Sequence, residues 1–307
     1  MVMYPSDWAT YTFDEMFQLY PNNTLSRDKL SNQGTIGNIH YGDVLIKYGA
    51  VLSVKDSIPK IKVEYESSAR AYLQQNDVIV ADTAEDETVG KVVQIGMIPF
   101  PLAGGLHTIV CRPLVPTATG YLGYYMNSRE YHDQLLPYIT GIKVSSVSKA
   151  SIRKTELHIP SSVEEQEAIV DVIERFDTYI ANLGELIEKK KAIRDGVLED
   201  LMSGRTRLDG FNDRWNSVRL GEICSLITKG TTPLDKSGRG NINFIKVENI
   251  DPSSGNIRIN QKITTAEHTG YLNRSQLQVD DILFSIAGTL GRVAVIKEEN
   301  LPANTNQ

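Results

Sequence analysis

Residues 162–203 read SVEEQEAIVDVIERFDTYIANLGELIEKKKAIRDGVLEDLMS, and the rest of the chain is organised around this stretch. Its apolar side chains recur at alternating spacings of three and four, with Lys190 as the one polar interruption, which places them in one seam along a helix. The seam consists of Ile169, Val172, Phe176, Tyr179, Leu183, Leu186, Ile193 and Val197. At about 1.5 Å of rise per residue the helix would be roughly 60 Å long. We therefore expect a coiled-coil-type helix that packs against a partner helix.

Signals at both ends support the predicted helix. Ser162 can cap the amide of Glu165, whose carboxylate is expected to reach back, and Gly204 follows the last turn. Gly184 and Gly196 lie inside the helix, where each costs about 1 kcal/mol relative to alanine. They are either tolerated defects or points of close contact with another helix.

The composition is that of an ordinary globular protein of 307 residues, long enough for two domains and a connector. The N-terminus lacks the features of a secretion signal, and no apolar run is long enough to span a membrane. The two cysteines, Cys111 and Cys224, lie far apart and away from any zinc-ligand spacing. We expect a cytoplasmic protein that binds no membrane, metal or cofactor.

The net charge of −6 is concentrated around the predicted helix. Between residues 161 and 209 there are twelve acids and seven bases, whereas the remainder has 26 acids and 25 bases. The flanking blocks are thus nearly neutral, which leaves room for local basic faces that could meet nucleic acid.

Residues 1–160 are expected to form a first domain with a mixed or antiparallel sheet, because short β-branched runs alternate with Gly, Asn and Pro. The expected strands are Gly42–Ile46, Asp77–Val80, Lys91–Ile95 and His107–Val110. An aromatic-rich helix is expected at Gly120–Asn127. The predicted fold is α+β, with residues 161–210 as the spacer.

Residues 211–307 repeat the pattern of the first domain. Residues 220–226 match 13–19 at an offset of 207, 281–284 match 77–80 at 204, and 290–295 match 89–94 at 201. Duplication explains three ordered matches, although two unrelated blocks with common strand patterns are the alternative. The second domain is expected to be incomplete at its C-terminus, so that the chain is a fragment or is completed by another molecule.

Catalysis is not expected. The sequence contains neither the motifs of a DNA methyltransferase nor a phosphate-cradling glycine loop. The five histidines, His40, His107, His132, His158 and His268, are scattered and are interpreted as structural or surface residues. No nucleophile with a recognisable base partner emerges, so no catalytic residue is assigned.

Two loops favour binding to DNA. Residues 140–155 contain four bases and no acid, and Lys143, Ser145, Ser146 and Lys149 could contact phosphate oxygens. In the second domain we select Lys229, Thr231 and Arg239. Loops of this composition are also common as plain solvated surface.

The arrangement resembles the specificity subunit of type I restriction-modification systems. The residues that carry the resemblance are 156–166 leading into the helix, 221–223 with 228–233, 245–250, and 281–292. The resemblance implies two target-recognition domains that read bipartite double-stranded DNA. It also implies helices that dock modification subunits with adenine-methylating activity, and restriction subunits where a nuclease is present.

We therefore expect a non-catalytic DNA-recognition subunit. An apolar seam of this length is also expected to lead to self-association or to capture by a modification subunit. The alternative function is a helical scaffold whose two globular ends bind proteins without DNA sequence preference.

Overall fold

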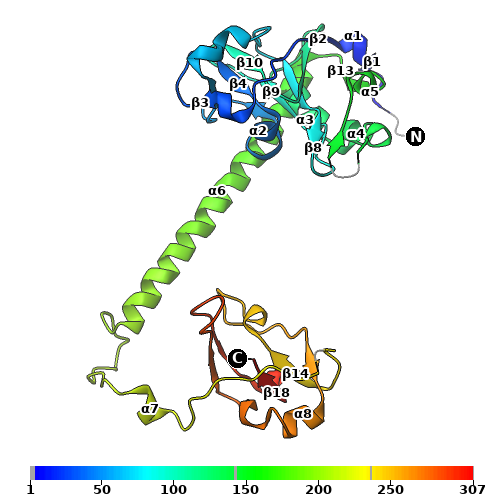
Figure 1. Cartoon of the computed structure of the whole chain (residues 1–307). Helices are drawn as coiled ribbons and strands as arrows, with labels where there is room; N and C mark the ends of the chain where they lie inside the picture. The colour runs from blue at the N-terminus through cyan, green and yellow to red at the C-terminus, as the bar shows by residue number, and fades with distance from the viewer. Residues whose placement is uncertain (1–3, 142–143, 236, 307) are drawn as a thin grey trace. The chain divides into compact units, whose positions relative to one another are not determined.

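The computed structural model describes residues 4–141, 144–235 and 237–306 (Figure 1). The chain divides into two compact units, one extending to Glu199 and the other beginning at Asp200. Both units combine short strands with short helices, and one long helix, α6 (Val163–Met202), lies almost entirely in unit 1. The predicted α+β fold with two mixed sheet regions and a long helix is confirmed.

Unit 1 is built on a five-stranded mixed sheet. Its order is β2 (Phe17–Tyr20), β11 (Thr108–Pro113), β7 (Val78–Ala81), β9 (Val92–Ile95) and β5 (Val51–Leu52). Among the described strands of this sheet, β5 and β9 pair in parallel and the other neighbours pair antiparallel. All four residues of β7 are buried, because Val78 and Val80 face one core cluster while Ile79 and Ala81 face another. A continuous apolar run is typical of a strand covered on both faces.

A second sheet and two strand pairs complete unit 1. The second sheet has the order β10 (Leu102–Gly104), β4 (Gly37–Ile39), β6 (Lys60–Ile61) and β3 (Leu30–Ser31). The pairs are β1 (Trp8–Thr12) with β13 (Glu156–Pro160), and β8 (Thr83–Ala84) with β12 (Ser145–Ser146). The short helices are α1 (Phe13–Met16), α2 (Tyr41–Ile46), α3 (Tyr121–Asn127), α4 (Arg129–His132) and α5 (Lys149–Ile152), with 3-10 turns at Arg27–Lys29, Val63–Ser68 and Leu136–Tyr138.

One predicted strand is wrong. Gly42–Ile46 belongs to helix α2, whose first turn is capped by His40, with Nδ1 accepting a hydrogen bond from the Gly42 amide at 3.2 Å. Val44 is fully buried whereas Ile46 is 89% exposed. Residues two apart share a face in a strand but lie on opposite sides of a helix, so this burial pattern fits only the helix. The other expected strands and the aromatic-rich helix are confirmed as β7, β9, β11 and α3.

Helix α6 is continuous over 40 residues and agrees with the predicted bounds. At its start the Glu165 amide donates to Ser162 Oγ at 3.2 Å, and Gly204 follows its end with φ +73°. The predicted reach-back of the Glu165 carboxylate is wrong, because Glu165 Oε1 accepts a hydrogen bond from Trp8 Nε1 at 3.2 Å. Strand β1 places Trp8 beside the helix and offers this competing donor.

The two glycines inside α6 have open surroundings. A Cβ atom added at Gly184 or Gly196 would meet nothing within 4 Å in the part of the chain that the structure describes. Contacts within the described chain therefore do not explain these glycines, and a partner helix remains a prediction.

Unit 2 contains a three-stranded sheet and a strand pair. The sheet has the order β15 (Lys262–Ile263), β14 (Ile242–Ile245) and β18 (Ala303–Thr305), and the pair is β16 (Ile282–Phe284) with β17 (Val293–Val295). The helices are α7 (Leu220–Ile223) and α8 (Thr265–Thr269), with 3-10 turns at Val247–Asn249, Asn273–Ser275 and Glu298–Asn300.

Strand register confirms the predicted duplication. In unit 1 Val78 lies opposite Gln94, and at the offsets of 204 and 201 the same positions in unit 2 are Ile282 and Val295, which also lie opposite each other. Asp77 precedes β7 and Asp281 precedes β16. The residues just before these two aspartates, Asn76 and Asp280, both have φ +71°. Unrelated blocks would not share both a register and a left-handed residue at the same position.

The two copies differ in burial. Val78 and Val80 of β7 are fully buried, whereas Ile282 and Phe284 at the matching positions of β16 are 69% and 62% exposed. In unit 1 this face of β7 packs against α1 and β11, which supply part of the same core cluster. Within the described part of unit 2, this face of the strand pair has no comparable cover.

Candidate nucleic-acid interface

An open polar pocket of about 300 Å³ lies at one edge of unit 1. Its lining residues come from the turn after β7 and the strand β8, from the turn before β11, from the 3-10 turn Leu136–Tyr138 and the residues after it, and from the segment that runs from β12 into α5. They are Asp82, Thr83, His107, Tyr138, Thr140, Ser146, Val147, Ser148 and Ser151. We refer to this feature as the polar pocket.

Backbone pairing brings the hydroxyl-rich loop to the pocket. Ser146 of β12 lies opposite Thr83 of β8, and the amide of Val147 donates to the carbonyl of Asp82 at 2.9 Å. Ser146 also exchanges backbone hydrogen bonds with Thr140, at 2.8 and 3.1 Å. Part of the predicted loop is therefore regular structure, since Ser145 and Ser146 form β12 and Lys149–Ile152 form α5.

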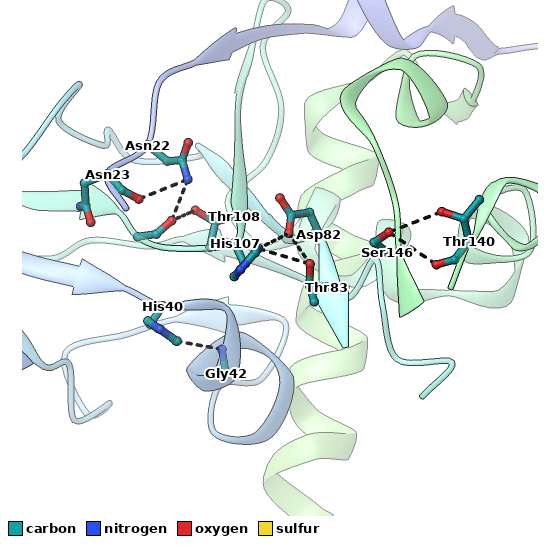
Figure 2. A network of polar contacts seen from close by, with 11 residues as sticks. Asn22, Asn23, His40, Gly42, Asp82, Thr83, His107, Thr108, Thr140 and Ser146 are labelled. Atoms are coloured by element: carbon teal, nitrogen blue, oxygen red, sulfur yellow. Dashed lines mark hydrogen bonds and ion pairs between the residues drawn. The ribbon is translucent and has the colours of Figure 1, made fainter. Parts of the chain in front are cut away.

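A carboxylate and an imidazole lie side by side in the lining of the pocket (Figure 2). Thr83 Oγ1 donates to Asp82 Oδ1 at 2.8 Å, and His107 Nδ1 lies 3.3 Å from both of these oxygens. His107 has φ +54°, an uncommon backbone conformation for a residue other than glycine. Such conformations are often retained at functional sites.

The turn that carries His107 is held by buried amides beside the pocket (Figure 2). Asn22 Nδ2 and Thr108 Oγ1 both donate to the carbonyl of Gly105, at 2.8 and 2.7 Å, and Asn23 Nδ2 donates to the carbonyl of Gly104 at 2.8 Å. The backbone amide of Asn23 also donates to the Gly104 carbonyl, at 2.9 Å, so both carbonyls of the turn are satisfied. The position of His107 is therefore determined by side chains more than 80 residues earlier in the chain.

An aromatic cluster extends from His107 to His40. The Tyr41 ring meets His107 edge-on, with centroids 5.3 Å apart, and lies 4.7 Å from His40. Burial, together with the nearby charge of Arg27, lowers the pKa of His40. His40 thus serves as a neutral helix cap in the core, whereas His107 faces the pocket.

Two lysines lie near the rim of the pocket. Lys149 is the first residue of α5 and is exposed, and no carboxylate pairs with it among the described residues. Lys154 is exposed, and its Nζ lies 4.6 Å from the ring centroid of Tyr138, a lining residue. By contrast, Arg153 pairs with Asp14 at 3.0 Å.

The structure brings together three of the four residues selected in unit 1. Ser145 and Ser146 form β12, and Lys149 follows three residues later at the pocket rim. The fourth, Lys143, lies outside the described residues. Sequence reasoning missed Asp82 and His107 because an acid and a lone histidine did not fit a search for basic loops.

The residues selected in unit 2 do not form one cluster. The Thr231 amide donates a hydrogen bond to the Thr305 carbonyl at 3.1 Å, and Thr231 Oγ1 accepts a hydrogen bond from Arg274 Nη2 at 3.1 Å. Lys229 and Arg239 are exposed, and no contact among the described residues links either of them to Thr231. No sequence pattern pointed to Arg274, because it lies 43 residues from Thr231.

Most of the helix seam is exposed to solvent. Ile169 packs against the core of unit 1, whereas Phe176 is 64% and Leu183 41% exposed. The remaining seam residues, Val172, Tyr179, Leu186, Ile193 and Val197, are exposed as well. Within the part of the chain that the structure describes, nothing pairs with this surface.

No cluster of three or more His, Cys, Asp or Glu side chains that could hold a metal ion occurs among the described residues. None of the helices in the described ranges has the length and apolar character needed to cross a lipid bilayer.

The sequence matches the family described as the type I restriction modification DNA specificity domain over residues 5–191 and 212–307. This match covers most of the chain, and the chain belongs to that family. It is therefore a DNA-specificity subunit of a type I restriction-modification system, which recognises DNA and is not the catalytic subunit.

Individual relatives agree with this assignment. A protein from Methanocaldococcus jannaschii, named as a type I restriction enzyme MjaX specificity subunit, is 22% identical over 95% of this chain and 69% of its own length. A chain solved in a study of complex assembly and conformational transition of the type I R-M system has a TM-score of 0.64 at 17% identity, covering 99% of this chain and 74% of that chain. The HsdS subunit from Thermoanaerobacter tengcongensis has a TM-score of 0.52 at 18% identity, with coverages of 98% and 74%. The two structures support the fold.

Proposed function

We propose that residues 1–160 and 211–307 are two target-recognition domains that read the two halves of a bipartite DNA site, with residues 161–210 as the spacer. Membership of the family indicates that the ligand is DNA. The strand register shared by β7/β9 and β16/β17 supports two domains with the same recognition role. A split site with an unread spacer suits two related domains, because B-DNA presents equivalent faces about every 34–36 Å.

In unit 1 the contacts to DNA are assigned to the polar pocket and its rim. Lys149 donates to phosphate and positions the duplex, with Ser145 and Ser146 beside it. The observation that supports this role is the exposed, unpaired ammonium next to a hydroxyl-lined pocket. Lys143 is assigned the same role, as are Lys229, Thr231 and Arg239 in unit 2.

The seam of α6 is assigned to protein partners. Seven of its eight selected side chains are exposed in the described chain, which supports docking of modification subunits that methylate adenine, or self-association. Restriction subunits would join the same complex where the system includes a nuclease.

Lys149→Ala provides the direct test in unit 1. We expect weaker binding to every duplex by a similar factor, and a slope of log affinity against log salt that is smaller by about one, because one phosphate contact is lost. Affinities are measured by fluorescence anisotropy with the full chain over a range of salt concentrations.

The matched control is Lys190→Ala, which removes an exposed ammonium from α6. An unchanged affinity and salt slope for Lys149→Ala would remove this lysine from the interface. Absence of any sequence preference in the unaltered chain would instead favour the scaffold alternative.

A further inference from the structure

The lining of the polar pocket includes a carboxylate oxygen that is free to accept a hydrogen bond. Asp82 Oδ1 accepts from Thr83 Oγ1 at 2.8 Å and lies 3.3 Å from His107 Nδ1. Asp82 Oδ2 has no donor among the described residues, and the side chain is 28% exposed. The carboxylate is therefore held in place through Oδ1, and Oδ2 is available to accept a hydrogen bond from a ligand.

The imidazole beside this carboxylate is held in the same way. His107 Nδ1 faces Asp82 and Thr83, so that Nε2 lies on the far side of the ring, and the side chain is 47% exposed. No hydrogen-bond partner of Nε2 occurs in the described ranges. The left-handed backbone at His107 and the amide network behind it fix the direction of the ring.

The charge pattern determines which part of DNA suits the pocket. A carboxylate repels phosphate, so the part of the pocket beside Asp82 is unfavourable for the DNA backbone, whereas Lys149 and Lys154 near the rim attract it. Base edges also offer neutral donors, because adenine N6 and cytosine N4 carry amino groups in the major groove, and Asp or Glu side chains accept from such groups. The remaining pocket walls carry hydroxyls, which donate or accept as required.

We propose that Asp82, positioned by Thr83 and His107, accepts a hydrogen bond from the amino group of one adenine or cytosine in the half-site read by unit 1. The inference rests on the proposed function, and it assigns a base-reading role to a residue outside the basic loops. Lysines near the rim hold the backbone while the Asp82 carboxylate in the pocket lining selects the base.

An isosteric substitution gives a directional test. In Asp82→Asn the remaining oxygen stays with Thr83 Oγ1, so the amide nitrogen takes the place of Oδ2 and presents a donor instead of an acceptor. We expect the preference at one position to change from an amino base to a keto base, guanine or thymine. We expect the original preference to fall by about 10- to 100-fold, the range of one specific base contact.

The experiment selects bound duplexes from a pool of random double-stranded oligonucleotides with the full chain and sequences them. Asp82→Ala is the second variant, and it is expected to lose the preference at that position without acquiring a new one. Asp7→Asn is the charge-matched control, because Asp7 is exposed and its side chain forms no hydrogen bond or ion pair among the described residues. Thermal unfolding checks that each variant is folded.

The outcomes separate the inference from the function on which it rests. If the unaltered chain enriches no motif, both fail. If it enriches a motif that Asp82→Asn and Asp82→Ala leave unchanged at every position, only the base-reading role of Asp82 is overturned. A uniform loss of affinity in both variants would assign the pocket to the backbone and would also overturn it.

Discussion

Gln166 Oε1 accepts a hydrogen bond from the backbone amide of Ala118 at 3.0 Å, deep inside unit 1. The other end of the same side chain donates to the carbonyl of Pro160 at 2.9 Å. One residue in the first turn of α6 thereby ties the helix both to the strand that precedes it and to the segment before α3. The sequence 160–166 thus has a structural role in anchoring the long helix.

Gln166→Ala is expected to destabilise unit 1 by about 2–4 kcal/mol, because a buried amide and a buried carbonyl each lose their partner. Glu167→Ala is the control, since Glu167 is the exposed neighbour on the same turn. Urea unfolding followed by circular dichroism measures the difference. Equal stability of the two variants would show that water replaces both hydrogen bonds.

Asp77 and Asp281 occupy the same position in the two units and differ in their partners. Each carboxylate accepts a hydrogen bond at 2.8 Å from the backbone amide three residues earlier. Of the two, only Asp77 is completely buried, and it forms a bidentate ion pair with Arg112. We expect Asp77→Ala to cost about 3–5 kcal/mol, because a guanidinium loses its partner. Asp281→Ala is expected to cost about 1 kcal/mol, the value of one hydrogen bond.

Differential scanning calorimetry of the full chain measures both changes. The prediction requires that the loss be larger for the aspartate of unit 1. Similar costs at the two positions would mean that the Asp77–Arg112 pair adds little to the shared turn.

His40 makes the stability of unit 1 dependent on pH. Its folded-state pKa is lowered, chiefly by burial, so the unfolded chain binds the proton first as the pH falls below about 6.5. The folded state therefore loses stability on acidification through this range. Asparagine can still cap α2 but does not titrate, so His40→Asn should show a smaller loss.

Urea midpoints at about pH 7.5 and about pH 5.5 measure this difference for both proteins. His158→Asn, a partly exposed histidine on β13, is the control for histidine loss in general. An unchanged pH dependence in His40→Asn would show that other groups dominate acid destabilisation.

The α6 seam is expected to mediate association without contributing to the stability of unit 1. Phe176→Ser removes a large exposed apolar side chain, so it should lower self-association or binding of a modification subunit and leave the unfolding midpoint unchanged. Sedimentation velocity at micromolar concentration measures association. Glu188→Ser, an exposed polar position on the same helix, is the control.

A stable, well-folded monomer that associates neither with itself nor with its modification subunit would contradict the assigned role of the seam. A large fall in the unfolding midpoint of Phe176→Ser would instead indicate that the side chain packs within the chain.

The sequence by itself determined the long helix, three of the four expected strands and the duplication. Each depends on a pattern within a short stretch: the three-and-four spacing of α6, the continuous apolar run of β7, and the matched stretches that later show the same register. Gly42–Ile46 was the exception, because a short apolar run satisfies both helix and strand, and only the burial of Val44 with exposure of Ile46 distinguishes them.

Only the tertiary structure decided where the polar pocket lies and which residues form it. Asp82, His107 and Ser146 are separated by 25 and 39 residues, and they meet because β8 pairs with β12 and because buried amides fold the turn before β11. Local periodicity specifies that a strand exists but not which distant strand it joins. The basic residues at the rim could therefore be selected from composition, whereas the place of Asp82 and His107 in the pocket depends on the long-range pairing of the folded chain.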